Sequence, residues 1–126
     1  MEPFETDAEK KLLDHARRPR NGVLLLPADA RARGVNPLCG DSVELTLRFD
    51  KAGKVAAVGF TGVGCTVSQG AASLLFERAL GRPRGELAAM ADKEVLDLVG
   101  VELNANRRKC ALVALHALKD ALKGPA

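Results

Sequence analysis

The chain carries, at residues 43–49, the run Val43-Glu44-Leu45-Thr46-Leu47-Arg48-Phe49, in which apolar and polar side chains alternate without a break. A period of two is typical of a β-strand that buries one face and exposes the other. The polar stretch 50–54 predicts a turn, and the apolar stretch 55–60 predicts a strand that returns beside the first. We therefore expect an antiparallel hairpin here.

Helical signals lie on both sides of this hairpin. Thr6 or Asp7 can cap a first helix that ends near Arg18, because Pro19 disfavours helical geometry in the residue before it. The stretch between this helix and the hairpin looks irregular, and residues 23–26 are the candidate for a third strand.

Three helices are predicted after the hairpin. The periodicity favours helices over residues 67–80 and 85–99, each followed by a glycine that can end it. Asn104 or Asn106 can cap the last helix. Strands followed by helices predict an α+β fold: one small antiparallel sheet of about three strands, packed by C-terminal helices, with an N-terminal helix. A length of 126 residues is that of a single domain, 1–126.

Composition narrows the classes of function. No run of about 18 apolar residues could cross a bilayer, and the acidic start is unlike a secretory signal, so we expect a cytoplasmic protein without a membrane partner. Three cysteines, an odd number, favour reduced thiols or metal chemistry over disulfides. The net charge of +3 could attract nucleic acid, but four aromatic residues are few for stacking on bases, so we do not expect nucleic acid as a partner.

A thiol and a carboxylate lie two residues apart in Asn36-Pro37-Leu38-Cys39-Gly40-Asp41. Residues at i and i+2 can face the same side, and Gly40 lets the backbone come close to a bound group. Cys39 and Asp41 can both become anionic ligands for zinc or iron. A turn with a buried cysteine and a capping aspartate is the plain alternative.

The two other cysteines lie at or near the starts of predicted helices. Cys65 follows a glycine-rich passage at a helix N-terminus, where the partial positive charge favours a thiolate. Cys110 follows three cations, and Arg107 shares nearly the same helical face, so it can offset the charge of a thiolate. Packing roles for both cysteines, and an ordinary exposed position for Arg107, are the alternatives.

The histidines are weaker candidates for a metal site. His116 lies about 120° around the helix from Cys110 and about 9 Å along it, so the two side chains cannot readily share an ion. His15 lies one turn after Leu12, which favours a packing or surface role. The chain also lacks a Cys-x-x-Cys pair, so any metal site has to be assembled by the tertiary fold.

Three motifs occur in a fixed order along the chain: Asn36-Pro37-Leu38-Cys39-Gly40-Asp41, Gly64-Cys65-Thr66-Val67-Ser68-Gln69-Gly70-Ala71-Ala72-Ser73 and Arg107-Arg108-Lys109-Cys110-Ala111-Leu112. Together they resemble the SufU/IscU family of iron-sulfur cluster assembly proteins. Pro19-Arg20-Asn21 after the first helix is also similar to that family, so the resemblance covers about residues 10–122.

The resemblance implies a ligand set of Cys39, Asp41, Cys65 and Cys110 for a metal ion or cluster, with Cys39 or Cys110 as the thiol that accepts persulfide sulfur. In the IscU branch a histidine precedes the last cysteine, whereas Lys109 stands there in this chain, as in the SufU branch, whose site binds zinc. The interval of 45 residues between the last two cysteines is instead similar to that of the IscU branch.

Two functions follow from the resemblance. A zinc-containing sulfur acceptor would take persulfide sulfur at Cys39 from a SufS/IscS-like cysteine desulfurase, with Arg107 balancing charge or helping this partner to dock. A scaffold would assemble a transient 2Fe-2S cluster on the same ligands and pass it to acceptor apo-proteins. The protein is then at most a zinc-dependent sulfurtransferase acting with a desulfurase, and otherwise a non-enzymatic scaffold.

Two further points bound this interpretation. The Leu-Pro-Pro-Val-Lys segment through which IscU proteins engage a chaperone is missing, because residues 98–103 contain no proline, so the resemblance gives no reason to expect an Hsp70-type chaperone as a partner. A hypothesis from another class is a structural zinc domain that uses its basic face for contacts, which predicts inert cysteines and salt-sensitive binding.

Overall fold

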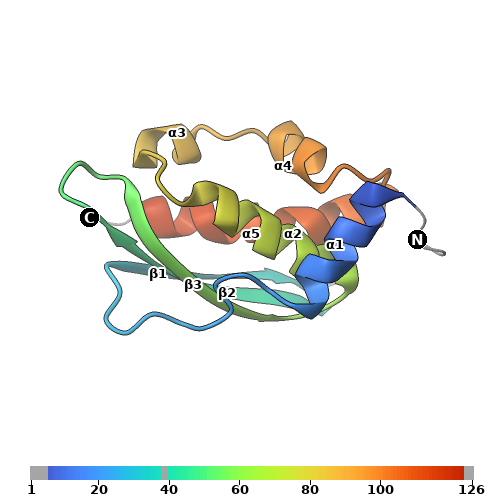
Figure 1. Ribbon diagram of the computed structural model, residues 1–126, viewed down its shortest axis with the longest axis horizontal. Coiled ribbons are helices and arrows are strands. Elements are labelled where there is room, and N and C mark those ends of the chain that lie inside the picture. The colour runs from blue at the N-terminus through green and yellow to red at the C-terminus, as the bar shows by residue number, and fades with distance from the viewer. Residues whose placement is uncertain (1–5, 38–39, 124–126) are drawn as a thin grey trace.

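The computed structural model describes residues 6–37 and 40–123. Within them, three strands form one antiparallel sheet in the spatial order β1-β2-β3: β1 (Ala30–Asn36), β2 (Asp41–Phe49) and β3 (Val55–Val63). The helices of these residues are α1 (Asp7–Arg17), α2 (Thr66–Ala79), α3 (Arg84–Ala88), α4 (Asp92–Val99) and α5 (Ala105–Lys123). The α+β fold with an N-terminal helix and a three-stranded sheet is confirmed (Figure 1).

The predicted hairpin forms the middle and one edge of the sheet. β2 pairs antiparallel with β3, with Leu45 opposite Phe60. The apolar positions of the alternating run are fully buried at Val43, Leu45 and Leu47, and they belong to one core cluster with residues of α2 and α5. Figure 1 shows the helices gathered over this one face of the sheet. The strand predicted from the period of two is therefore confirmed, with its apolar side chains in the core.

The prediction of a third strand at residues 23–26 was wrong. The third strand is β1, which lies inside the stretch that was expected to be irregular. Residues 23–26 instead cross the outer face of the sheet, where the backbone N–H of Leu25 donates to Thr46 Oγ1 at 2.9 Å. Leu26 is 86% exposed there, so its apolar character does not mark a buried strand. In the first half of β1 small alanines alternate with arginines, and this pattern lacks the β-branched and aromatic side chains that are typical of a strand.

The helix predicted over residues 85–99 is divided into α3 and α4. The first of these helices ends at Ala88 and the second begins at Asp92, and the backbone is extended at Ala91 between them. No glycine or proline stands at this break, so the sequence carried no local signal for it. The break lets α3 contact α5 and lets α4 contact both α2 and α5, while Met90 between them stays buried. Tertiary packing divides the helix.

Predicted helix starts are confirmed at two positions. Of the two candidates at the N-terminus, Thr6 caps α1, because its Oγ1 accepts from the N–H of Glu9 at 3.1 Å and the Glu9 side chain bonds back to the N–H of Thr6. Asn104 caps α5 through its Oδ1, which accepts from the N–H of Arg107 at 2.9 Å. No helix in the described residues is long and apolar enough to cross a membrane.

Close contact between β1 and α5 occurs at Gly34. A Cβ atom added there would lie 2.7 Å from the carbonyl oxygen of Val113 and 3.2 Å from the Cβ of Ala117. Glycine at this position lets the end of β1 lie against the helix that contains Cys110. The contact therefore helps to set the distance between the sheet and that cysteine.

We predict that Gly34→Ala destabilises the protein by about 1–3 kcal/mol, because the added methyl group forces β1 away from α5. Gly85→Ala is the matched control, since nothing lies within 4 Å of a Cβ at Gly85 in α3. The control should leave stability unchanged or raise it slightly. Urea unfolding midpoints measure both changes, and equal midpoints for the two variants would contradict the account of this contact.

Candidate metal centre

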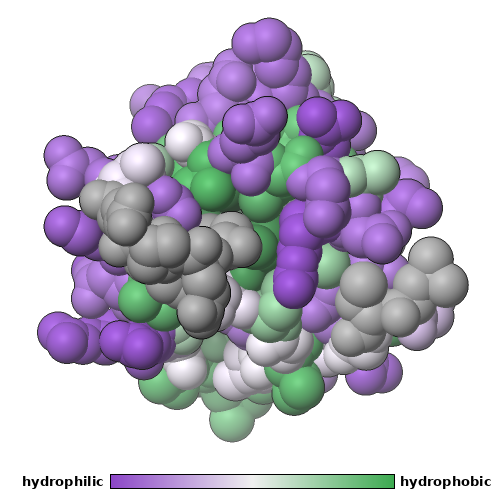
Figure 2. Space-filling view, turned by 90° about the vertical axis from the view of Figure 1, so that its right-hand side faces the viewer, coloured by the Kyte–Doolittle hydropathy of each residue, from purple (hydrophilic) through white to green (hydrophobic). Residues whose placement is uncertain are grey.

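Three of the predicted ligands, Asp41, Cys65 and Cys110, come together at one end of the molecule. A carboxylate oxygen and two Sγ atoms all lie within 4.8 Å of one another. Asp41 begins β2, Cys65 directly precedes α2, and Cys110 lies in α5, so three elements distant in sequence each supply one group. Figure 2 looks onto this end of the molecule, where hydrophobic surface near the centre lies between hydrophilic side chains above it and on both sides.

In the described residues, the Asp41 carboxylate receives hydrogen bonds through only one of its two oxygens. Its Oδ1 accepts hydrogen bonds from the backbone N–H of Cys65 and from Ser68 Oγ, both at 3.1 Å. Gly64 makes room for this arrangement, because a Cβ there would overlap Asp41 Oδ1 and Ser68 Oγ. Oδ2 is buried and has no hydrogen-bond partner among the described residues. A buried carboxylate oxygen without a partner is costly, so this atom is placed to meet a cation.

Cys65 lies at the start of α2, as predicted. It is the N-cap residue of the helix, and its Sγ accepts a hydrogen bond from the N–H of Ser68 at 3.5 Å. The side chain is half-buried, whereas Cys110 is 1% exposed. Of these two cysteines, Cys65 is therefore the more accessible to solvent.

Cys110 receives a contact from β1 that the sequence did not predict. Asn36, the last residue of β1, is buried, and its Nδ2 donates to Cys110 Sγ at 3.9 Å. Asn36 is also the pairing partner of Asp41 in the sheet. The paired residues Asn36 and Asp41 thus have different roles. Asn36 donates a hydrogen bond to the Cys110 thiol, and Asp41 places its carboxylate near both thiols.

Arg107 stands beside both thiols from the first turn of α5. Its pKa is raised above the ordinary value for arginine, chiefly by the charge of a Cys65 thiolate, and burial opposes this effect. A hydrogen bond to Cys65 and the charge of Cys110 raise the pKa further. The guanidinium is therefore close enough to offset negative charge in the cluster.

The remaining candidates divide into three cases. Cys39 lies outside the described residues. His116 is exposed on α5 and does not belong to the cluster, as expected from its helical position. His15 is buried, with its Nδ1 2.8 Å from Ser73 Oγ, and burial lowers its pKa. Of the packing or surface role expected for His15, the structure shows the packing role.

The three groups fit a zinc ion. Two thiolates and a carboxylate are common zinc ligands, and tetrahedral zinc with bonds of about 2.0–2.3 Å places its ligand atoms roughly 3.3–3.8 Å apart. A spread of at most 4.8 Å needs only small side-chain movements to reach this geometry. The partnerless Oδ2 of Asp41 supplies a donor atom that nothing else in the described residues uses. Three ligands leave one tetrahedral position for a further group.

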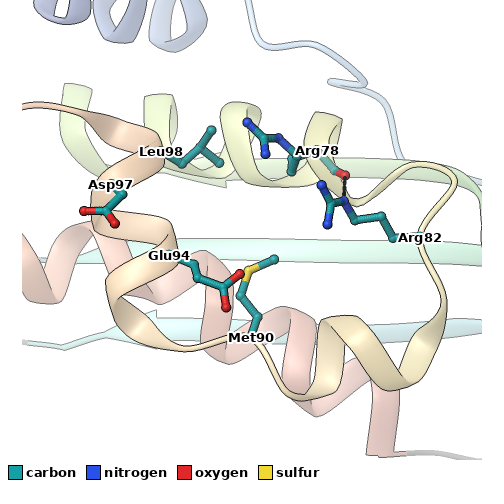
Figure 3. A pocket seen from close by; sticks show the side chains of 6 residues that line it. All are labelled: Arg78, Arg82, Met90, Glu94, Asp97 and Leu98. Carbon is teal, nitrogen blue, oxygen red and sulfur yellow. Dashed lines mark hydrogen bonds between the residues drawn. The ribbon is translucent and has the colours of Figure 1, made fainter.

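A separate open pocket of about 300 Å³ lies near the C-terminal end of α2 (Figure 3). Its lining is Arg78, Arg82, Met90, Glu94, Asp97 and Leu98. Arg82 donates from Nε to the carbonyl of Arg78 at 3.1 Å and forms an ion pair with Glu86. Cys65 lies about 20 Å away, at the other end of the helix. Its lining combines two arginines, two carboxylates and two apolar side chains, and it contains no thiol or imidazole.

Sequence reasoning missed two residues of the centre, Asn36 and Ser68. Asn36 was considered only as part of a loop motif, because its contact with Cys110 spans 74 residues. Ser68 was considered only as a residue of a predicted helix. Its position three residues after Cys65 is the signal that could have found it, since the N-cap residue and the third helical residue commonly share hydrogen bonds.

Comparison with known proteins finds similarity to proteins of iron-sulfur cluster assembly. The family model of the NifU-like N terminal domain matches residues 7–124. The iron-sulfur cluster assembly scaffold protein IscU of Streptococcus pyogenes serotype M1 is 33% identical, over 87% of this chain and 79% of the relative. The zinc-dependent sulfurtransferase SufU of Bacillus subtilis strain 168 is 32% identical, over 92% of this chain and 89% of the relative.

Solved structures support the fold. The N-terminal part of a NifU-like protein from Brucella abortus superposes with a TM-score of 0.73 at 21% identity, over 90% of each chain. A protein assigned as the SufU scaffold of Fervidobacterium islandicum AW-1 gives a TM-score of 0.79 at 23% identity, over 94% of this chain and 96% of the other. At these identities the likeness shows the fold alone.

We predict that Asp41→Ala weakens zinc binding by about 100-fold or more, because loss of outer contacts alone commonly costs about 10–100-fold and this change removes a ligand. His116→Ala is the control, since His116 is exposed outside the cluster. Competition with a chromophoric chelator measures the zinc Kd of each variant. Zinc binding by Asp41→Ala as tight as that of the parent would exclude the carboxylate as a ligand.

Proposed function

The chain belongs to the family of NifU-like N-terminal domains, and we propose that it takes part in iron-sulfur cluster assembly as a zinc-containing acceptor of persulfide sulfur. The observation that carries the proposal is the cluster of Asp41, Cys65 and Cys110, together with Asp41 Oδ2, which is buried without a hydrogen-bond partner among the described residues. Further support comes from the similarity to a zinc-dependent sulfurtransferase over 92% of the chain.

In the proposed reaction Cys39 receives sulfur from a cysteine desulfurase. The Cys39 thiolate attacks the terminal sulfur of a persulfide on the desulfurase, and a new S–S bond forms at Cys39. The S–S bond on the desulfurase breaks, and its cysteine leaves as a thiolate. One thiolate is consumed and one is released, so the exchange needs no external oxidant or reductant.

The position of Cys39 in the sequence supports this role. Cys39 lies two residues before Asp41, so chain geometry limits the distance between their Cα atoms to about 7 Å. Cys39 is therefore the proposed fourth ligand, and zinc bound there would keep the thiol deprotonated. Arg107, which lies beside Cys65 and Cys110, would balance the charge of the thiolates or contact the incoming desulfurase.

A second candidate function is a scaffold that holds a transient 2Fe-2S cluster and delivers it to acceptor apo-proteins. The observation that favours it is the 33% identity to a protein named as an iron-sulfur cluster assembly scaffold. The same cysteines and Asp41 can ligate iron, since clusters are held mainly by thiolates. The two functions differ in whether sulfur first arrives as a persulfide on this chain.

We predict that the purified protein stimulates turnover of its cognate cysteine desulfurase in the presence of cysteine and a reductant. Cys39→Ser should abolish this stimulation, because a hydroxyl at this position cannot carry a persulfide. His116→Ala serves as the control variant and should stimulate like the parent. Far-UV circular dichroism of each variant checks that the fold is retained.

Undiminished stimulation by Cys39→Ser would exclude Cys39 as the acceptor. Absence of stimulation by the parent would favour the scaffold function. In that case anaerobic incubation with iron and sulfide should give a stable visible chromophore, which a purely zinc-dependent acceptor should not give.

A further inference from the structure

Ser68 lies fully buried behind the metal centre and touches two of its ligands. Its side chain has 0% exposure, and its Oγ is 3.1 Å from Asp41 Oδ1. Its backbone N–H donates to Cys65 Sγ at 3.5 Å. The proposed function assigns no role to the Ser68 hydroxyl.

The hydroxyl proton of Ser68 has two acceptors within reach, Asp41 Oδ1 and the carbonyl oxygen of Cys65, both at 3.1 Å. The Cys65 carbonyl already accepts from the backbone N–H of Gln69 at 3.1 Å. A carboxylate also forms the stronger bond, because the hydrogen bond is charge-assisted. Gln69 Nε2 donates to Ser68 Oγ at 3.2 Å and occupies one of its lone pairs. These contacts direct the proton towards Asp41.

Two donors therefore meet at one oxygen of Asp41. The N–H of Cys65 and the O–H of Ser68 both bond to Oδ1, and Oδ2 keeps no partner among the described residues. A carboxylate can bind a metal ion through one oxygen or through both. We propose that Ser68 is a positioning residue that occupies Oδ1 and makes Asp41 a ligand through Oδ2 alone. This inference rests on the proposed function, because it concerns the same metal centre.

The competing explanation is that Ser68 is an ordinary buried helix serine. Such residues commonly bond to a carbonyl three or four positions earlier, and Cys65 lies three positions earlier. Ser73 on the same helix provides an internal comparison, because it also has 0% exposure. Its Oγ bonds to His15 Nδ1 at 2.8 Å and to the N–H of Arg20 at 2.9 Å, away from the metal ligands. A purely structural role predicts that both serines affect stability alone.

Ser68→Ala and Ser73→Ala, each made in the full chain, test the proposal. We expect Ser68→Ala to raise the zinc Kd by about 10–100-fold, the usual effect of losing a partner of a metal ligand. Ser73→Ala should keep the zinc Kd within about twofold of the parent, although it loses one buried and one partly buried hydrogen bond and should melt at a lower temperature. Competition with a chromophoric chelator gives each Kd.

Cobalt(II) in place of zinc gives an independent signature. In Ser68→Ala only the N–H of Cys65 still bonds to Oδ1, so this oxygen becomes more available to the metal ion. Binding of Asp41 through both oxygens would raise the coordination number and should weaken the visible d–d absorption relative to the parent and Ser73→Ala. The rise in Tm on adding zinc, measured within each variant, corrects for any loss of stability in the metal-free protein.

Equal zinc affinities and equal cobalt spectra for the two variants would overturn the positioning role while leaving the proposed function intact. Failure of the parent itself to bind zinc or cobalt would remove the proposed function and this inference together. A Kd that rises for Ser68→Ala alone would support the role of its hydroxyl.

Discussion

Burial of the Asp41 carboxylate is the constraint around which the metal centre is arranged. Asp41 occupies the same inward-facing side of β2 as the core residues Val43 and Leu45, and only 1% of it is exposed. An ionised group in such a position is strongly destabilising unless hydrogen bonds or a cation compensate it. The chain supplies two hydrogen bonds to Oδ1 and none from the described residues to Oδ2, and it places two thiols within 4.8 Å of a carboxylate oxygen. A bound cation would thus relieve an existing cost of folding.

The packing of the other elements places Cys65, Ser68 and Cys110 near this carboxylate. The tight passage after β3 starts α2 beside Asp41, so Cys65 and Ser68 arrive together from the first turn of one helix. The contact of β1 with α5 at Gly34 holds Cys110 from the other side, within reach of Asn36. Sheet pairing and helix packing, rather than a local sequence motif, therefore set the geometry of the ligands.

Local patterns predicted the parts of the structure that depend on near neighbours. The alternation around Leu45 and the cap at Thr6 are short-range signals, and both were interpreted correctly. β1 escaped prediction because its inward side chains are small, and its place in the sheet comes from pairing with β2. Ser68 and Asn36 were missed because their contacts with the centre join residues 27 and 74 positions apart. The resemblance to a family predicted the candidate ligands, whereas the residues that contact them became known only from the fold.

The three candidate ligands in the described residues are widely spaced along the chain, and this spacing has a mechanical consequence. Positions 41, 65 and 110 divide the sequence into intervals of 24 and 45 residues. An ion bound to all three would close two large loops, and such a cross-link restricts the unfolded chain as a disulfide does. It would fasten a strand, the start of one helix and the body of another. Cys39, the proposed sulfur acceptor, lies before Asp41 and outside both loops, so it could leave the ion to accept sulfur while both cross-links stay closed.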